Sequence, residues 1–302
     1  MTDMDKFAEE VLAAVKEKDA GAFHAKIVMA EKNNGITLTG IAGAMEGDAG
    51  GPCVYLNEYF EEYKNGWMEV KEAAEDVYRK ILKYKDGLKD IDTNNFMKWE
   101  WAEPRIQAKL INMERNKEML TGMPWKQFLD LAVVYYVKIS GVMGGGEAYF
   151  LVKNSSMEIW GQDEESLYQT AMSNMHKDGG PVFESMEAVL QGTAADDMVP
   201  FMPEEPELGM YVLSNRSRLL GAAEILDSGT LKMISGKMGG DFIVFPSSLH
   251  ESIILPSDAK FTYTELAAMV REINMVQVDR EERLSNHIYL YEKDKGVLRI
   301  AA

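Results

Sequence analysis

The segment FHAKIVMAEKNNGITLTGI, residues 23–41, decides how the first part of the chain folds. Two apolar runs, residues 23–30 and 36–41, flank the dipeptide Asn34-Gly35. This dipeptide tolerates the positive φ angles of a tight type I′ turn, and the runs have the length and composition of strands. The segment therefore predicts a β-hairpin.

Helical patterns flank this hairpin on both sides. Apolar residues recur at helical spacing within residues 1–20, 56–64 and 70–82. The stretch 85–95 that follows is rich in Asp, Asn and Lys and lacks periodicity, as is typical of a boundary between domains. We therefore expect an N-terminal α+β domain at residues 1–95.

Strand-like patterns dominate the remaining chain. They predict a larger α+β domain at residues 96–302, with a further division near residue 200 left open. Thr262 and Glu265 form a capping box that predicts a helix start. The expected strands are residues 106–113, 128–139, 148–160, 210–214, 241–245 and 252–255, and residues 219–238 are expected to be helical. The fold class is thus α+β, with a helix-hairpin-helices unit followed by a mostly antiparallel sheet packed with helices.

Charge and composition exclude several classes of protein. The 302 residues are 46% apolar and 27% charged, as in ordinary globular proteins, and the formal net charge is −17. Direct binding of nucleic acid is not expected, because that affinity comes largely from basic side chains that neutralise phosphates. The acidic residues are scattered, and a surface that mimics nucleic acid stays an open alternative.

The chain is expected to act in the cytoplasm. The first ten residues carry acids where a secretory signal would carry basic residues, and no apolar run approaches the length of a membrane span. Cys53 is the single cysteine, which excludes an intramolecular disulfide and fits a reducing compartment. We expect it to be a structural thiol.

No motif for a cofactor or a metal is present. The sequence contains neither a glycine-rich loop ending in Lys-Ser or Lys-Thr nor a GxGxxG fingerprint. Its four histidines are too dispersed for a recognisable metal spacing, and they are His24, His176, His250 and His287. We therefore expect no cofactor and no metal site.

One segment concentrates reactive side chains, and it reads PSSLHE at residues 246–251. In an extended backbone Ser248 and His250 project to the same face with their backbones about 6 to 7 Å apart. They are candidates for a nucleophile and its base, and the adjacent Glu251 completes the catalytic candidates. The alternative is structural, with these side chains satisfying backbone groups at a sharp corner between two strands.

A second candidate lies where a strand is expected to meet a helix. Asn215 and Arg216 stand in the segment SNRSR, residues 214–218. Backbone amides and arginines at such a junction can hold a carboxylate or a phosphate. The alternative is a helix cap with solvated arginines.

The chain also resembles known families. The motifs that carry the likeness are NNG at 33–35, VYLN at 54–57, MYVLSN at 210–215, GAA at 221–223, FPSSLHE at 245–251 and the segment 274–284. In these motifs the chain is similar to a family of uncharacterised proteins abundant in anaerobic gut Firmicutes. Its later part is distantly similar to a second uncharacterised bacterial family with a Pro-Ser-Ser corner. The resemblance implies a bacterial cytoplasmic protein and assigns no catalytic residue.

Two hypotheses about function follow. The first is a non-enzymatic protein-binding or regulatory protein, because no complete catalytic constellation is present. The second is a hydrolase or transferase with Ser248 as nucleophile, His250 as base and an anion contact at Arg216. The sequence does not decide the substrate, the ligand or the oligomeric state.

Overall fold

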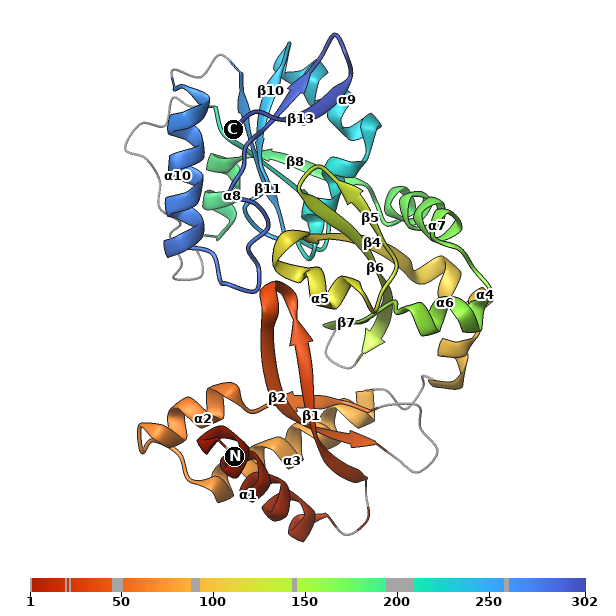
Figure 1. Cartoon of the computed structure of the whole chain (residues 1–302), viewed down its shortest axis with the longest axis vertical. Coiled ribbons are helices and arrows are strands. Elements are labelled where there is room, and N and C mark those ends of the chain that lie inside the picture. Colours follow the sequence, from red (N-terminus) through yellow and green to blue (C-terminus); the bar gives the residue numbers. More distant parts are fainter. Residues whose placement is uncertain are drawn as a thin grey trace. The chain divides into compact units, whose positions relative to one another are not determined.

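The chain divides into two compact units in a computed structural model, which describes residues 2–19, 21, 23–44, 51–87, 93–142, 146–193, 209–257 and 261–302. Unit 1 comprises Met1–Arg105 and Lys138–Phe150, and unit 2 comprises Ile106–Val137 and Leu151–Ala302 (Figure 1). Unit 1 thus extends past the boundary expected at residue 95 and includes a second segment.

Unit 1 combines helices with a three-stranded antiparallel sheet in the order β1-β2-β3. Its elements are α1 (Asp3–Lys18), β1 (His24–Lys32), η1 (Asn33–Gly35), β2 (Ile36–Ala44), β3 (Cys53–Tyr55), α2 (Asn57–Lys64), α3 (Val70–Gly87), η2 (Thr93–Met97), α4 (Trp99–Ala102) and η3 (Glu103–Arg105).

The expected hairpin is present, with a longer connection than the sequence suggested. The antiparallel register of β1 and β2 closes on the pair Lys32 and Ile36, so three residues connect the strands. Asn34 and Gly35 have φ angles of 61° and 69°. The Asn-Gly dipeptide therefore supplies the positive φ angles as expected, in a three-residue loop and not a two-residue turn.

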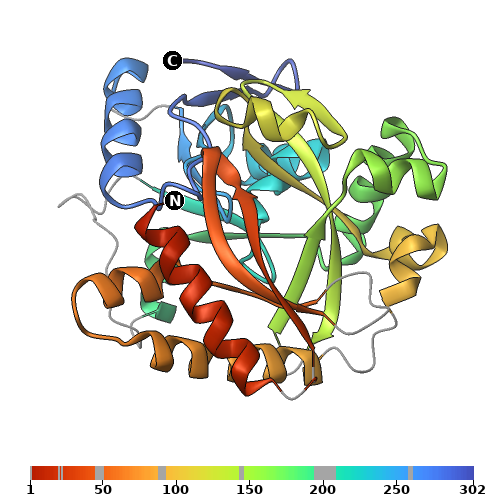
Figure 2. The same ribbon diagram turned by 60° about the horizontal axis from the view of Figure 1, so that its bottom comes forward.

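The core of unit 1 lies between the hairpin and its helices. α1 and α3 lie side by side over one face of β1 and β2 (Figures 1 and 2). α1 begins at a capping box in which the Thr2 and Asp5 side chains each bond the other's backbone N–H. The buried apolar residues include Phe7, Ala8, Val11, Val15, Ile41, Val54, Ala73, Val77 and Ile81.

Unit 2 contains most of the strands, although the end of β6 and all of β7 except Leu151 belong to unit 1. The elements from residue 106 onward are β4 (Ile106–Asn112), η4 (Glu114–Asn116), α5 (Lys117–Leu120), β5 (Trp125–Phe128), β6 (Leu131–Val142), β7 (Gly146–Leu151), α6 (Asn154–Trp160), α7 (Glu164–Lys177), β8 (Pro181–Ser185), α8 (Met186–Thr193), β9 (Tyr211–Asn215), η6 (Gly221–Leu226), α9 (Ser228–Met238), β10 (Phe242–Phe245), β11 (Ser252–Pro256), α10 (Tyr263–Val276), β12 (Tyr289–Glu292) and β13 (Val297–Ile300).

These strands form two sheets. The larger sheet has the order β13-β12-β10-β11-β9-β8, and every neighbouring pair in it is antiparallel. In the smaller sheet β4 and β5 pair with opposite edges of β6, and β7 also pairs with β6. The expectation of an α+β fold with a mostly antiparallel sheet is confirmed.

One expected strand is wrong. Residues 148–160 were expected to be extended, but β7 ends at Leu151 and α6 begins at Asn154. The Lys153 backbone N–H donates to the Ser156 hydroxyl at 3.4 Å, which supports the start of this helix. Polar residues that cap a helix within an apolar run thus override the strand pattern.

The two sheets of unit 2 are joined by buried polar side chains. Asp130 accepts hydrogen bonds from the Ser285 hydroxyl at 2.7 Å and the Tyr289 hydroxyl at 2.5 Å. Asn112 Nδ2 donates to the Leu284 carbonyl at 2.7 Å. Burial and the Asp130 carboxylate raise the pKa of Tyr289 well above its ordinary value. The tyrosine therefore stays a hydrogen-bond donor at neutral pH.

The described residues contain neither a candidate membrane span nor a candidate metal centre. None of their helices has both the length and the apolar character needed to cross a membrane. The same part of the chain contains no group of three His, Cys, Asp or Glu side chains arranged to hold a metal ion.

Candidate functional site

The catalytic candidates lie on a corner between β10 and β11 in unit 2. The backbone of this corner is bonded to a segment that precedes β12, through Leu249 N to Glu282 O at 2.9 Å and Leu284 N to Ser247 O at 3.0 Å. Ser248 also forms an isolated β-bridge with Arg283. The corner is therefore held as a short extension of the sheet.

The structure brings Ser248 and His250 together, but not as a nucleophile and its base. The Ser248 hydroxyl oxygen accepts a hydrogen bond from the His250 backbone N–H at 3.1 Å. His250 Nδ1 accepts from the Leu220 backbone N–H at 3.2 Å, and its Nε2 lies 3.2 Å from Glu282 Oε1. An acceptor Nδ1 requires the proton on Nε2, which then donates to the carboxylate.

This geometry is the one that the structural alternative describes. Both ring nitrogens of His250 are engaged, and no hydrogen bond joins its ring to the Ser248 hydroxyl in the described part of the chain. Burial raises the pKa of Glu251, and the positive charge of Arg218 opposes that rise. The catalytic roles of Ser248, His250 and Glu251 stay predictions.

The ligand-binding candidates Asn215 and Arg216 have different surroundings. Asn215 ends β9, where its Nδ2 donates to the Leu219 carbonyl at 2.8 Å and its Oδ1 accepts from the Ser217 hydroxyl at 3.1 Å. Arg216 is exposed and lies across Gly179, where a Cβ atom would approach its Cδ to 2.6 Å. Asn215 lines a cavity of unit 2, whereas Ser248, His250 and Arg216 do not.

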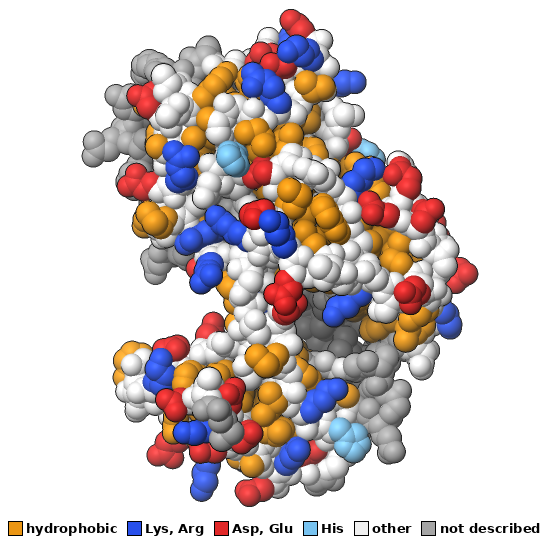
Figure 3. Space-filling model, viewed as in Figure 1, with side chains coloured by type: hydrophobic (Ala, Val, Ile, Leu, Met, Phe, Trp, Pro, Cys, Tyr) orange, Lys and Arg blue, Asp and Glu red, His pale blue; other side chains and the backbone are white. Residues whose placement is uncertain are grey.

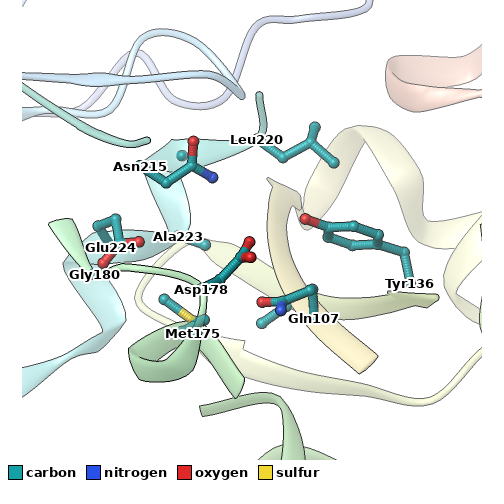
Figure 4. A pocket seen from close by; sticks show the side chains of 11 residues that line it. Gln107, Tyr136, Met175, Asp178, Gly180, Asn215, Leu220, Ala223 and Glu224 are labelled. Carbon is teal, nitrogen blue, oxygen red and sulfur yellow. The ribbon is translucent and has the colours of Figure 1, made fainter. Parts of the chain in front are cut away.

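That cavity is small and polar. About 20 Å³ of it is open to water, which is room for about one water molecule. The lining comes from β4, β6, the end of α7 and the residues after it, the end of β9, and η6 with the residue before it. It consists of Gln107, Ala108, Tyr136, Met175, Asp178, Gly180, Asn215, Leu220, Gly221, Ala223 and Glu224. In Figure 4 the Asp178 carboxylate and the Tyr136 hydroxyl point toward one another.

Glu224 is the side chain that distinguishes this cavity. It is only 5% exposed, and its carboxylate has no hydrogen-bond partner among the described residues. Burial, and then the negative charges of Asp227 and Asp178, raise its pKa to about 7. Carboxyl groups with such a pKa concentrate at functional sites.

Sequence reasoning missed Glu224, although a signal was present. It is the single charged residue in the run LLGAAEIL, residues 219–226. A lone acid in an apolar run must be buried, paired or at a turn. Gln107 has a similar signal, because it lies in β4, where every residue is buried.

The hydrogen bond between His250 and Leu220 holds one wall of the cavity in place. The Leu220 backbone that donates to His250 belongs to a lining residue, and the next residue, Gly221, packs tightly against β9. A Cβ atom on Gly221 would lie 2.3 Å from Ser214 Oγ and 2.8 Å from the His250 carbonyl oxygen. The catalytic candidates of the sequence are therefore structural neighbours of the cavity.

A second concave site lies in unit 1. A groove of about 250 Å³ is lined by residues of α1, β1 and β2, which are Asp5, Ala8, Glu9, Ile27, Met29 and Thr39. Its apolar part includes Met29, which is 70% exposed. Two acids, Asp5 and Glu9, supply its charge.

The described residues form an α+β fold that includes the unit 2 cavity and the unit 1 groove, and the sequence carries no recognisable cofactor motif. Residues 4–293 match the model of a family of unknown function, DUF5688, and the chain belongs to that family. The resemblance to a family of uncharacterised proteins is thereby confirmed. No curated protein and no solved structure matched the chain.

Proposed function

We propose that this chain is a non-enzymatic protein-binding or regulatory protein, and that unit 1 binds an extended segment of a partner protein beside β1. The observation that supports it is the position of β1 at an edge of its sheet. On its outer side β1 pairs with no other strand in the described residues, so its backbone N–H and C=O groups are open to pairing. Extended peptides commonly bind by adding a strand to such an edge.

The groove beside β1 supplies the selectivity. Side chains of an added strand alternate between the two faces of the sheet, and those on the α1 face would enter the groove. Ile27 and Met29 offer apolar contact there, while Asp5 and Glu9 favour a basic side chain. Figure 3 shows hydrophobic side chains at the surface among acidic and basic ones. The partner segment would therefore alternate apolar and basic residues.

A reducing compartment, the cytoplasm of a bacterium, is part of the proposal. Support comes from the single cysteine, Cys53, whose thiol pKa is raised by burial, which disfavours the reactive thiolate. The net charge of −17 supports a protein partner over direct contact with nucleic acid. The proposed function involves no contact with a membrane.

A library of short linear peptides displayed on phage tests the binding proposal. We expect enrichment of peptides in which apolar and basic residues alternate, and slower hydrogen exchange of β1 amides when such a peptide is added. Full burial of a methionine is worth about 1.5 to 3 kcal/mol. Because Met29 is 70% exposed, Met29→Asp should weaken binding at least about tenfold.

The matched control is Met275→Asp in α10, because Met275 is also 70% exposed. It should leave peptide binding unchanged, whereas Glu9→Lys should weaken binding and remove most of its salt dependence. Peptides without a common pattern, or equal binding by Met29→Asp and the native chain, would contradict the proposal.

The alternative function is a hydrolase or transferase that uses Ser248 and His250 with an anion contact at Arg216. It requires the His250 ring to leave Leu220 and turn toward the Ser248 hydroxyl. An ester and phosphoester screen of the native chain tests it. Activity that disappears in Ser248→Ala, with the fold retained, would establish the alternative and displace the non-enzymatic proposal.

A further inference from the structure

The cavity of unit 2 presents two buried polar side chains without partners. Glu224 is 5% exposed and Gln107 is 7% exposed, and both line the cavity. Neither side chain has a hydrogen bond within the described parts of the chain, and neither contributes an atom to the set of fully enclosed polar atoms that lack partners. Both residues line the cavity, so a ligand there would supply the missing partners. Leaving such groups unsatisfied destabilises the folded state, and a bound ligand recovers that loss.

The charge of the cavity selects a cation. Asp178 and Asp227 add negative charge to that of Glu224 and raise its pKa. Two basic side chains near these carboxylates do not line the cavity: His176 lies 3.8 Å from Asp227, and the exposed Arg216 lies across Gly179. A positive ligand group would therefore be stabilised by the field of the carboxylates.

The size and chemistry of the lining narrow the class of cation. The open space of about 20 Å³ admits one group the size of a water molecule. A primary ammonium group has this size and carries three N–H donors and no acceptor, which suits a carboxylate and an amide oxygen. A divalent metal ion is disfavoured, because the described residues contain no suitable group of three ligating side chains.

We propose that the unit 2 cavity binds a primary ammonium group. The Glu224 carboxylate is its counter-ion, and the side-chain amide oxygen of Gln107 is a second hydrogen-bond acceptor. The ammonium group would belong to a small amine or to a longer ligand whose amine end enters the cavity. Because this site lies in unit 2, it is independent of the partner surface proposed for unit 1.

Methylammonium chloride is the probe that tests the site. We expect saturable NMR chemical-shift changes of the Gly180 and Ala223 backbone amides, which line the cavity, in the full-length chain. Glu224→Gln keeps the size of the side chain and removes its charge, so it should weaken binding at least about tenfold. Gln107→Leu should weaken binding to a smaller extent, because it removes the uncharged acceptor.

The pH dependence gives a second test of the same assignment. Protonation of Glu224 removes the counter-ion, and its pKa is raised to about 7 by burial and by Asp227 and Asp178. Methylammonium binding to the native chain should therefore weaken about tenfold for each pH unit below ~7, until it reaches the affinity of the protonated form.

Two controls complete the experiment. Glu272→Gln removes an exposed carboxylate of α10 and should bind methylammonium like the native chain. Tetramethylammonium, which has no N–H donor and is larger, should not compete. Absence of saturable shifts, equal binding by Glu224→Gln, or equally effective competition by tetramethylammonium or sodium would each overturn the assignment.

Discussion

Replacement of Glu224 by Gln should change how the stability of the protein depends on pH. Glu224 is only 5% exposed, and its carboxylate has no hydrogen-bond partner among the described residues. Burial, with added repulsion from Asp227 and Asp178, raises its pKa from an ordinary value of 4.5 to about 7. The folded state therefore holds this proton more tightly than the unfolded chain does.

The sign and size of the effect follow from this difference. Below pH ~4.5 the carboxyl group is protonated in both states, and its ionisation costs the folded state nothing. As the pH rises toward ~7 the unfolded chain loses the proton first, so the free energy of unfolding falls. At ~1.4 kcal/mol per pH unit, the difference between 4.5 and about 7 amounts to about 3 kcal/mol.

Urea unfolding of the native chain and of Glu224→Gln, from pH ~4 to ~9, measures this cost. The free energy of unfolding of the variant, relative to the native chain, should rise by about 3 kcal/mol between pH ~4.5 and ~7 and stay constant beyond. Glu272→Gln, at an exposed position, should run parallel to the native chain throughout. A constant difference between Glu224→Gln and the native chain across this range would refute the reasoning.

Three further predictions concern the stability of unit 2. Gly221→Ala should destabilise the protein by about 1 to 3 kcal/mol and so lower its melting temperature, because the added Cβ would lie 2.3 Å from a hydroxyl oxygen of β9. Gly236→Ala should instead stabilise α9 by about 0.5 to 1 kcal/mol, because nothing lies within 4 Å of its added Cβ. His250→Ala should lower the free energy of unfolding, measured with urea, by about 1 to 3 kcal/mol, because it leaves the Leu220 N–H without its acceptor. An unchanged unfolding midpoint would contradict this structural role of His250. Asp130→Asn should destabilise unit 2 by about 1 to 3 kcal/mol, because Asp130 accepts hydrogen bonds from both a serine and a tyrosine hydroxyl, and calorimetry would measure the loss.

The elements that the sequence predicted well are those with local causes. The capping box of Thr262 and Glu265 is present at the start of α10, with Glu265 N bonded to the Thr262 hydroxyl. Asn34 and Gly35 adopt the positive φ angles that their residue types favour. Each of these features depends on residues within three or four positions of one another, so it can be read from the sequence.

The elements that the sequence did not predict depend on competition between patterns. Residues 148–160 carry apolar side chains that fit a strand, but a helix begins at Asn154. Residues 219–238 were expected to be helical, and the structure divides them into η6 and α9 at Asp227, which caps α9. A short polar cap decides where a helix begins, while an average apolar pattern does not.

By itself the sequence determined the fold class, the hairpin and the capping box at Thr262 and Glu265, together with the short list of polar residues near Asn215 and Ser248. Only the tertiary structure decided which of these residues share a cavity. Gln107 and Glu224 meet the same cavity from β4 and η6, far apart in the chain, while His250 is occupied by Leu220 and Glu282. The physical reason is that burial and the loss of hydrogen-bond partners are set by residues distant in sequence, and these two quantities decide whether a polar side chain is structural or free to bind a ligand.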